Sequence, residues 1–160
     1  MFLKIKHIIV FILLGCGSYA YAQENSANIK KNLKLGEDAY ERSDFLNAFN
    51  YFSLILKTDT GNYDLIFKSG VCLFSINKTD SSSKRFFIKS AAKIPEAHFY
   101  LGRIYHLKGL SKKAIEELYY FKSINSEEII ENTEVNILIN SCESALIEES
   151  KKGNYLVKNL

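Results

Sequence analysis

Few side chains in this chain have the types and spacing that catalysis or metal binding requires. The histidines are His7, His98 and His106. His98 and His106 are eight residues apart, over two helical turns, which is too far for both to bind one metal ion directly. Asp59 and Asp64 lack the ligand spacing of a calcium-binding loop, and the chain has no glycine-rich phosphate loop, HExxH or GxSxG motif. We therefore expect a protein that is not an enzyme and holds no cofactor or metal ion.

The three cysteines suggest structural rather than chemical roles. Cys16 lies in the N-terminal apolar segment, whereas Cys72 and Cys142 each fall within apolar residues at helical spacing. A small thiol in such a pattern is typical of a buried hydrophobic side chain. In an oxidising compartment Cys72 and Cys142 have the alternative of forming a disulfide. We expect two buried thiols.

Composition excludes some classes of protein. With 160 residues, 47% hydrophobic content, one proline and eight glycines, the chain fits one globular domain rather than a disordered or fibrous protein. The formal net charge is only +3, and no lysine or arginine run follows one helical face, so we expect no nucleic-acid partner. The ten tyrosines and eleven phenylalanines must either fill a core or line a groove.

Residues 1–22 have the anatomy of a cleavable signal peptide. Lys4 and Lys6 give a positively charged N-terminal region, and an apolar run follows over Ile8–Leu14. Ala20 and Ala22 then fit the small-x-small cleavage pattern. The apolar run is much shorter than the roughly 20 residues that cross a bilayer. We expect export, with the protein in the periplasm or on the periplasmic face of the outer membrane.

The same segment supports a second interpretation. Leu13-Leu14-Gly15-Cys16 resembles a bacterial lipobox, in which Cys16 would be the lipidated residue. Cleavage after Ala22 would leave a soluble periplasmic protein, whereas acylation of Cys16 would tether the chain to a membrane. We expect membrane contact only through such a lipid or through a partner, and the sequence leaves both interpretations open.

A repeat of helix–turn–helix units organises the middle of the chain. Gly36, Gly70 and Gly102 lie in apolar helical patterns with spacings of 34 and 32 residues. The tetratricopeptide repeat (TPR) has a period of about 34 residues. We expect an all-α TPR helix–turn–helix solenoid of about three repeats, over residues 29–61, 62–94 and 95–126, plus a C-terminal capping helix over 127–150.

The third repeat shows the pattern best. Pro95 suits a first helical turn, Gly109 suits a left-handed helix end, and Leu101-Gly102-x-x-Tyr105 is followed by Ala114, Leu118 and Phe121. The first repeat matches at almost the same offsets. The small or aromatic residues that we expect in the repeat core are Gly36, Ala48, Gly70, Gly102, Tyr105 and Ala114.

The second repeat and the C-terminal segment are less regular. Ser82 or Ser83 stands where the other repeats have alanine, and the run Asp80–Ser83 suits a lengthened or frayed turn before Lys84. We expect Gly153 to end the capping helix, so that residues 151–160 form a tail, with Tyr155–Leu160 as the start of a strand.

The order of these parts resembles the N-terminal region of certain Bacteroidetes envelope proteins. The resemblance rests on the signal peptide, the degenerate TPRs, the helix containing Phe99-Tyr100-Leu101-Gly102, the last helix with its cysteine and the segment Val157–Leu160. In that family a WD-type β-propeller and an outer-membrane-protein-A-like peptidoglycan-binding domain follow, and some members are linked to type IX secretion or gliding. The 160 residues include neither domain, so the resemblance does not imply wall anchoring by this sequence.

The TPR resemblance also implies a binding face, formed by the first helix of each repeat. The matching positions that we predict to contact a partner are Lys30, Leu33, Glu37, Tyr40, Phe67, Val71, Phe74, Glu96, Phe99, Arg103 and His106. Aromatic side chains with a few charges suit a protein or peptide partner, and Arg103 suits a carboxylate. The alternative is that Phe67, Phe74 and Phe99 only pack between helices.

These expectations lead to two hypotheses of function. The first is an exported TPR scaffold or adaptor that mediates protein–protein interaction in a bacterial cell-envelope assembly. The second is that the chain is a truncated N-terminal segment of a larger outer-membrane, peptidoglycan-associated structural protein.

Overall fold

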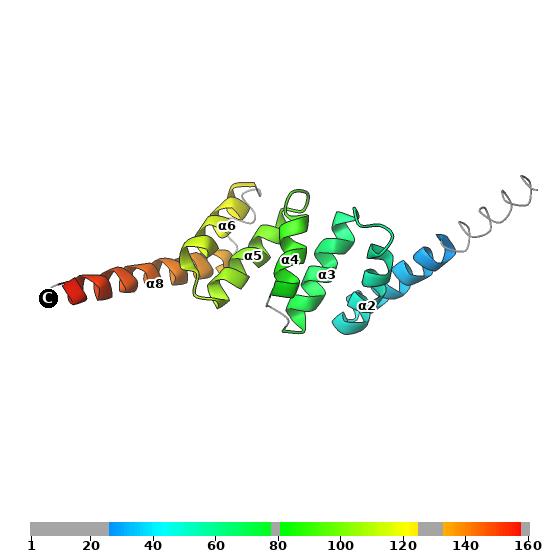
Figure 1. Cartoon of the computed structure of the whole chain (residues 1–160), viewed down its shortest axis with the longest axis horizontal. Helices are drawn as coiled ribbons and strands as arrows, with labels where there is room; N and C mark the ends of the chain where they lie inside the picture. The colour runs from blue at the N-terminus through cyan, green and yellow to red at the C-terminus, as the bar shows by residue number, and fades with distance from the viewer. Residues whose placement is uncertain (1–25, 78–80, 125–132, 158–160) are drawn as a thin grey trace, which may run out of the picture. The chain divides into compact units, whose positions relative to one another are not determined.

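The computed structural model describes residues 26–77, 81–124 and 133–157, and every regular element in these ranges is an α-helix (Figure 1). A first helix covers residues 26–41. It is followed by α2 (Phe45–Leu56), α3 (Tyr63–Ser75), α4 (Ser81–Ser90), α5 (Glu96–Leu107), α6 (Ser111–Ile124) and α8 (Thr133–Val157). The chain divides into two compact units, Met1–Thr60 and Gly61–Leu160. The proposed signal peptide, including Cys16, lies outside the described residues.

In the first unit, the helix over residues 26–41 packs against α2 through a glycine. A Cβ atom at Gly36 would lie 2.6 Å from Cε1 of Phe52, so the absence of a side chain lets the aromatic ring reach the helix backbone. The buried hydrophobic side chains of this pair are Ala39, Ala48, Phe52 and Ile55.

The same contact occurs in both helix pairs of the second unit. A Cβ atom at Gly70 would lie 2.9 Å from Cε1 of Phe87, which joins α3 to α4. A Cβ atom at Gly102 would lie 2.6 Å from Cγ of Leu118, which joins α5 to α6. Each pair therefore brings a large side chain of its second helix directly onto a glycine of its first helix.

The first helix of each pair also ends in the same backbone conformation. Ser43, Asn77 and Gly109 have φ angles of 59°, 61° and 67°, in the left-handed region. A left-handed residue after a helix lets the chain reverse direction within a few residues. Only Gly109 is recognisable from the sequence as a left-handed helix end, because serine and asparagine adopt the conformation less readily than glycine.

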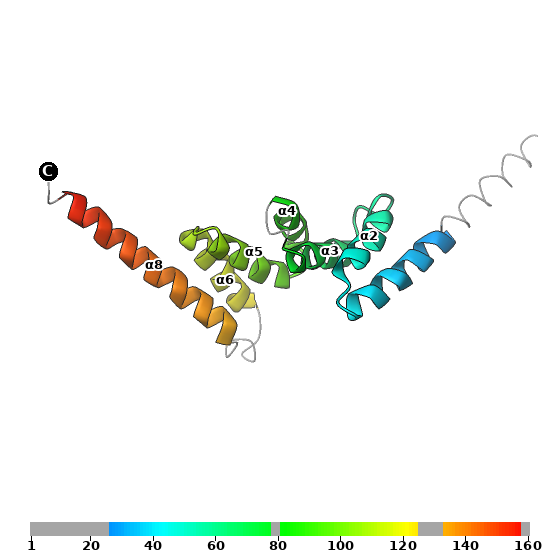
Figure 2. The same cartoon turned by 90° about the horizontal axis from the view of Figure 1, so that it is seen from below.

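The N-terminal half of α8 completes the core of the second unit. Val135 and Ile139 of α8 form a buried cluster with Leu118 and Phe121 of α6. None of the side chains from residue 143 to residue 151 is fully buried. The C-terminal end of α8 extends beyond the other helices of the unit (Figures 1 and 2).

The expected frayed turn before Lys84 is wrong for Ser81–Ser83, which form the first turn of α4. The start of a helix tolerates serine because the first backbone N–H groups lack helical acceptors and are able to donate to a nearby side-chain oxygen. Ser83 is completely buried, as are Ala48 and Ala114 in the other pairs, because its side chain is only slightly larger than that of alanine.

The expected end of the last helix at Gly153 is also wrong, because α8 continues to Val157. A glycine inside a helix costs about 1 kcal/mol relative to alanine, which does not suffice to end a helix of 25 residues. Residues 151–157 are thus helical rather than part of a tail or a strand. The expected start of the capping helix at 127–132 lies outside the described residues.

Candidate functional site

Tyr100 of α5 lies at the centre of a group of aromatic rings from α3, α4 and α5. Its ring centroid is 5.7 Å from that of Phe67, 5.4 Å from Phe74, 5.6 Å from Phe99 and 4.7 Å from Phe87. The ring of Phe87 is stacked on Tyr100 with an interplanar angle of 9°, and the other three meet it edge-on. We call these five residues the aromatic cluster.

Exposure divides the aromatic cluster into a buried base and an accessible layer. Phe87 is completely buried against Gly70, whereas Phe67, Phe74, Phe99 and Tyr100 are each partly exposed. Rings that are held by their neighbours and still reach solvent need little further ordering to contact a ligand. The cluster therefore both packs α3, α4 and α5 together and presents aromatic surface.

Arg103 covers the exposed side of this layer. Its guanidinium carbon lies 4.9 Å from the ring centroid of Phe74 and 5.6 Å from that of Phe99, within the range of cation–π attraction. Its Nε lies 3.5 Å from Oε1 of Glu134 at the start of α8. The side chains of Arg103 and Glu134 are 35% and 53% exposed, so solvent reaches this ion pair.

The surroundings of Tyr100 keep its phenol protonated. Burial raises the pKa of Tyr100 above its ordinary value, the charge of Arg103 lowers it, and the charge of Glu134 raises it, with a net rise. The hydroxyl group of Tyr100 is therefore neutral at physiological pH. As a neutral group, it is able both to donate and to accept hydrogen bonds.

His106 lies apart from the cluster, on the last turn of α5. Its Nδ1 is 3.4 Å from Sγ of Cys142 on α8. Burial, and to a smaller extent the charge of Glu143, raises the pKa of the Cys142 thiol. Cys142 is therefore a protonated, buried group and not a reactive thiolate. Both Cys72 and Cys142 are buried free thiols, as expected.

His98, the other histidine of α5, faces α6. Its Nδ1 lies 2.6 Å from Oε2 of Glu117, and its ring centroid is 4.4 Å from that of Tyr120. Since both imidazoles contact side chains of other helices, each is an interhelical contact. In the ranges that the structure describes, no three histidine, cysteine, aspartate or glutamate side chains are placed to hold a metal ion.

The predicted contact residues of the first unit lie on the helix over residues 26–41. Lys30 and Leu33 are exposed, and Glu37 and Tyr40 are half-buried. The ring of Tyr40 packs edge-on against Phe45 at 5.8 Å and lies 6.2 Å from Phe52. Tyr40 is thus partly engaged in packing its own helix pair.

In the second unit, the structure brings four of the predicted contact residues together: Phe67, Phe74, Phe99 and Arg103. Val71 is not available to a partner, because it is buried with only 6% exposure. Glu96 is exposed at the start of α5. His106 is held by Cys142 rather than by the aromatic cluster.

Among the predicted repeat-core residues, the small ones are buried and the large one is not. The buried residues are Gly36, Ala48, Gly70, Gly102 and Ala114. Tyr105 is partly exposed, and its ring contacts two ammonium groups, Lys84 Nζ at 4.7 Å and Lys113 Nζ at 5.9 Å from its centroid.

Sequence reasoning missed three residues of this site, Phe87, Tyr100 and Glu134. Tyr100 lies between the predicted positions 99 and 103, and a run of His, Phe and Tyr before the glycine was the available signal. Glu134 lies in the expected capping helix, but no sequence signal indicates which helix its side chain contacts. Only the packing of α8 against α5 and α6 brings its carboxylate to Arg103.

No model of a known protein family matches the chain. No curated protein matches it either. Among the part of the chain that the structure describes, no helix combines the length and apolar character of a membrane span.

Solved structures do resemble this chain. One is the type III secretion chaperone SycD of Yersinia enterocolitica, crystallised in complex with a peptide of the translocator YopD. The match has a TM-score of 0.63 at 18% sequence identity and covers 71% of this chain and 91% of the SycD chain. At this identity the likeness concerns the fold alone. Together with the helix pairs described above, it confirms an all-α, TPR-like fold.

Proposed function

We propose that this protein is an exported scaffold that binds a peptide segment of a partner protein on the surface formed by Phe67, Phe74, Phe99, Tyr100 and Arg103. The observation that carries the proposal is that partly exposed aromatic rings and an accessible guanidinium group lie together on α3 and α5, the first helices of two successive repeats. Aromatic and arginine side chains contribute most to binding energy in protein interfaces.

The chemistry of this surface favours a peptide with an apolar side chain next to a carboxylate. The rings offer edges and faces to the apolar group, and Arg103 is able to pair with the carboxylate bidentately. A partner carboxylate must compete with Glu134, whose Oε1 lies 3.5 Å from Arg103 Nε, a long distance for a charge-assisted hydrogen bond. Exchange of one exposed ion pair for another costs little.

The structural likeness to SycD supports the same class of function. SycD has the TPR-like fold and was crystallised with a peptide of another protein. We extend that mode of action to this chain because the aromatic surface lies on its own helices and not because the two sequences are alike.

The binding surface is tested by panning a random peptide library on the purified protein. We expect enrichment of peptides that combine an aromatic or aliphatic residue with an acidic one. Arg103→Ala should weaken the selected peptides at least tenfold without lowering the melting temperature by more than a few degrees. Arg85→Ala is a matched control, because Arg85 is exposed on α4. Equal affinity of the wild type and Arg103→Ala would contradict the proposal.

We place the scaffold in the periplasm or on the periplasmic face of the outer membrane, in a cell-envelope assembly. The support is the anatomy of residues 1–22 and the resemblance to Bacteroidetes envelope proteins linked to type IX secretion or gliding. Mass spectrometry of the native N-terminus distinguishes a chain that starts at Gln23 from one acylated at Cys16. An unprocessed Met1 in the cytoplasmic fraction would contradict export.

The same resemblance supports a second candidate, a segment of a larger protein with propeller and peptidoglycan-binding domains. An immunoblot of fractionated native cells, with an antibody against residues 26–157, separates the two. A band several times larger than 18.3 kDa in the outer-membrane fraction would favour the larger protein. A band near the size of this chain in the soluble periplasm would favour the adaptor.

A further inference from the structure

Two ammonium groups from different helices converge on the ring of Tyr105 of α5. Nζ of Lys84 on α4 lies 4.7 Å from the ring centroid, and Nζ of Lys113 on α6 lies 5.9 Å from it. Both distances are within the range of cation–π attraction. Tyr105 and Lys84 are partly exposed, and Lys113 is exposed. The second helices of two successive repeats thus place positive charge beside one accessible ring.

The charge of these two lysines is not balanced by a carboxylate in the parts of the chain that the structure describes. Neither Lys84 nor Lys113 forms an ion pair there. Glu117 follows Lys113 at the i,i+4 spacing of a helical ion pair, but its Oε2 lies 2.6 Å from Nδ1 of His98 instead. Two like charges near one ring repel each other, so an anion that reaches both is attracted by both.

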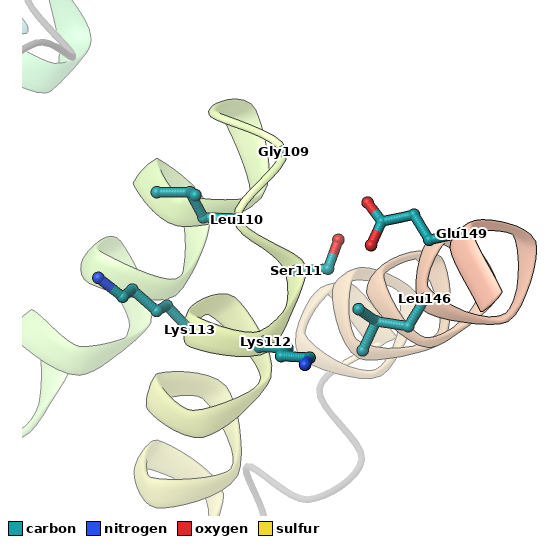
Figure 3. Close-up of a pocket in the computed structure, with 7 residues that line it drawn as sticks. All are labelled: Gly109, Leu110, Ser111, Lys112, Lys113, Leu146 and Glu149. Carbon is teal, nitrogen blue, oxygen red and sulfur yellow. The ribbon is translucent and has the colours of Figure 1, made fainter. Parts of the chain in front are cut away.

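Leu110 adds an apolar side chain to the same surface. It is 43% exposed, and its N–H donates to the carbonyl oxygen of Tyr105 at 2.9 Å, which holds it beside the end of α5. The side chains of Leu110 and Lys113 are directed to the same side of the start of α6, away from Glu149 of α8 (Figure 3). The carboxylate of Glu149 therefore does not face this surface. We call Lys84, Tyr105, Leu110 and Lys113 the basic patch.

The basic patch is separate from the aromatic cluster. Tyr105 follows Arg103 by two residues, which rotates its side chain by about 200° around α5. Arg103 lies over the rings of Phe74 and Phe99, whereas Tyr105 lies beside lysines of α4 and α6. The two surfaces are therefore able to hold different partners.

We propose that the basic patch binds an acidic segment of a second partner protein, in which an apolar side chain lies between two carboxylates. The carboxylates pair with the ammonium groups of Lys84 and Lys113, and the apolar side chain packs on Leu110 and the ring of Tyr105. Exposed ion pairs contribute little one at a time, so binding requires both carboxylates and the apolar contact together. This inference goes beyond the peptide site on the aromatic cluster and makes the protein a bridge between two partners.

An extended segment supplies this pattern with alternate residues. Side chains at i, i+2 and i+4 of a strand point to the same side, and they span about 13 Å. That span suits two ammonium groups that each lie within 5.9 Å of one ring centroid. An anionic membrane is the other partner that a basic surface attracts. Recognition of anionic lipids uses clusters of roughly four to eight lysines and arginines, whereas two ammonium groups meet at Tyr105, so the patch favours a peptide.

The proposal is tested by titrating the ¹⁵N-labelled full chain with the capped peptide acetyl-Glu-Ser-Leu-Ser-Glu-amide and following the backbone amide signals of the protein. We expect saturable shifts at residues 84, 105, 110 and 113. Replacement of both glutamates of the peptide by glutamine should weaken binding at least fivefold, because the ammonium groups lose their counterions. Replacement of its leucine by serine should do the same, because the apolar contact is lost. Equal affinity for the parent peptide and either derivative would overturn the proposal.

Neighbouring lysines of α6 provide a matched pair of variants. Lys113→Gln and Lys112→Gln remove the same charge, but the Lys112 side chain is directed to the side of α6 on which Leu146 lies (Figure 3). Lys113→Gln should weaken the parent peptide at least fivefold, and Lys112→Gln less than twofold. Lys84→Gln should resemble Lys113→Gln. An equal loss in Lys112→Gln and Lys113→Gln would reduce the effect to overall charge and refute the patch.

Two further measurements separate this site from the aromatic cluster and from a membrane. Arg103→Ala should leave affinity for the peptide unchanged, and a loss as large as that of Lys113→Gln would place the peptide on the aromatic cluster instead. Sedimentation with vesicles of phosphatidylglycerol and phosphatidylcholine should be the same for the wild type and Lys84→Gln. Vesicle binding that Lys84→Gln abolishes would assign the patch to an anionic membrane and overturn the proposal.

Discussion

The helix pairs α3–α4 and α5–α6 follow the same plan with different side chains. In both, a glycine of the first helix receives a large side chain of the second, Phe87 on Gly70 and Leu118 on Gly102. Leu118 completes an aliphatic contact with α8, whereas the ring of Phe87 stacks on Tyr100 of the next helix pair. In the α3–α4 pair the contact is thus made by an aromatic ring that also reaches the next helix pair, and the partly exposed rings of the cluster rest on it.

The α3–α4 helix pair supports the candidate binding surface through Phe87. Phe67 and Phe74 pack between helices and also remain partly exposed. Phe87 supports them from below, with its centroid 5.9 Å from Phe67 and 6.4 Å from Phe74. The Phe87–Gly70 contact and the candidate binding surface are therefore parts of one arrangement.

Removing the large side chain tests the comparison most strongly. Phe87→Ala should lower the free energy of unfolding by about 3–5 kcal/mol, since it empties a fully buried aromatic site. Leu118→Ala should cost on the order of 2–5 kcal/mol. Phe87→Ala should also disturb peptide binding, whereas Leu118→Ala should lower stability with less effect on bound peptide. Urea unfolding and binding assays measure both, and equal loss of binding in the two variants would contradict the distinction.

Filling the glycine positions is the next test. Gly102→Leu should overpack α5 against Leu118 and destabilise the protein by roughly 1–3 kcal/mol or more. Gly70→Leu should do the same through the stiff ring of Phe87. Gly109→Leu is unsuitable as a control because of its positive φ, so exposed Lys108→Leu serves instead. Melting temperatures report the result, and an unchanged value for Gly102→Leu would refute the close contact.

Exchanging serine and alanine at Ser83 and Ala114 should change the free energy of unfolding in opposite directions. The hydroxyl of Ser83 is buried without a partner among the described residues, so Ser83→Ala should stabilise the protein by about 1–2 kcal/mol. Ala114→Ser places a hydroxyl at the matching position of α6 and should destabilise it by a similar amount. Chemical denaturation of both variants decides the matter, and stabilisation by Ala114→Ser would show that the positions are not equivalent.

Substitutions at the left-handed residues that follow the helices should change the free energy of unfolding least. Asn77→Gly should raise the free energy of unfolding by a few tenths of a kcal/mol to about 1 kcal/mol, because glycine adopts the left-handed conformation without strain. Gly109→Ala should lower it by about 1 kcal/mol for the same reason. A loss of stability in Asn77→Gly would mean that the asparagine side chain contributes more than its backbone strain costs.

Much of the fold could be predicted from the sequence, because the repeat is a local pattern. The glycine spacing, the buried alanines and the turn at Gly109 each depend on residues close in sequence. The errors at Ser81–Ser83 and Gly153 came from judging single residues by intrinsic preference. Such preferences amount to at most about 1 kcal/mol per residue, and helix packing overrides them.

The candidate sites were predictable only in part. The positions of Phe67, Phe74, Phe99 and Arg103 followed from the repeat. The contact of Arg103 with Glu134 and that of His106 with Cys142 did not. Both contacts join α5 to α8, and these two helices are far apart in the sequence.

The sequence by itself determined that the chain is all-helical and that its helices pair, because the spacing of glycines within apolar helical patterns is visible in the sequence. The tertiary structure alone decided which aromatic rings remain exposed and which charge Arg103 meets. Those properties depend on the angle and register at which helices of different repeats pack. That angle and register result from the combined contacts of several helices, which no local pattern encodes.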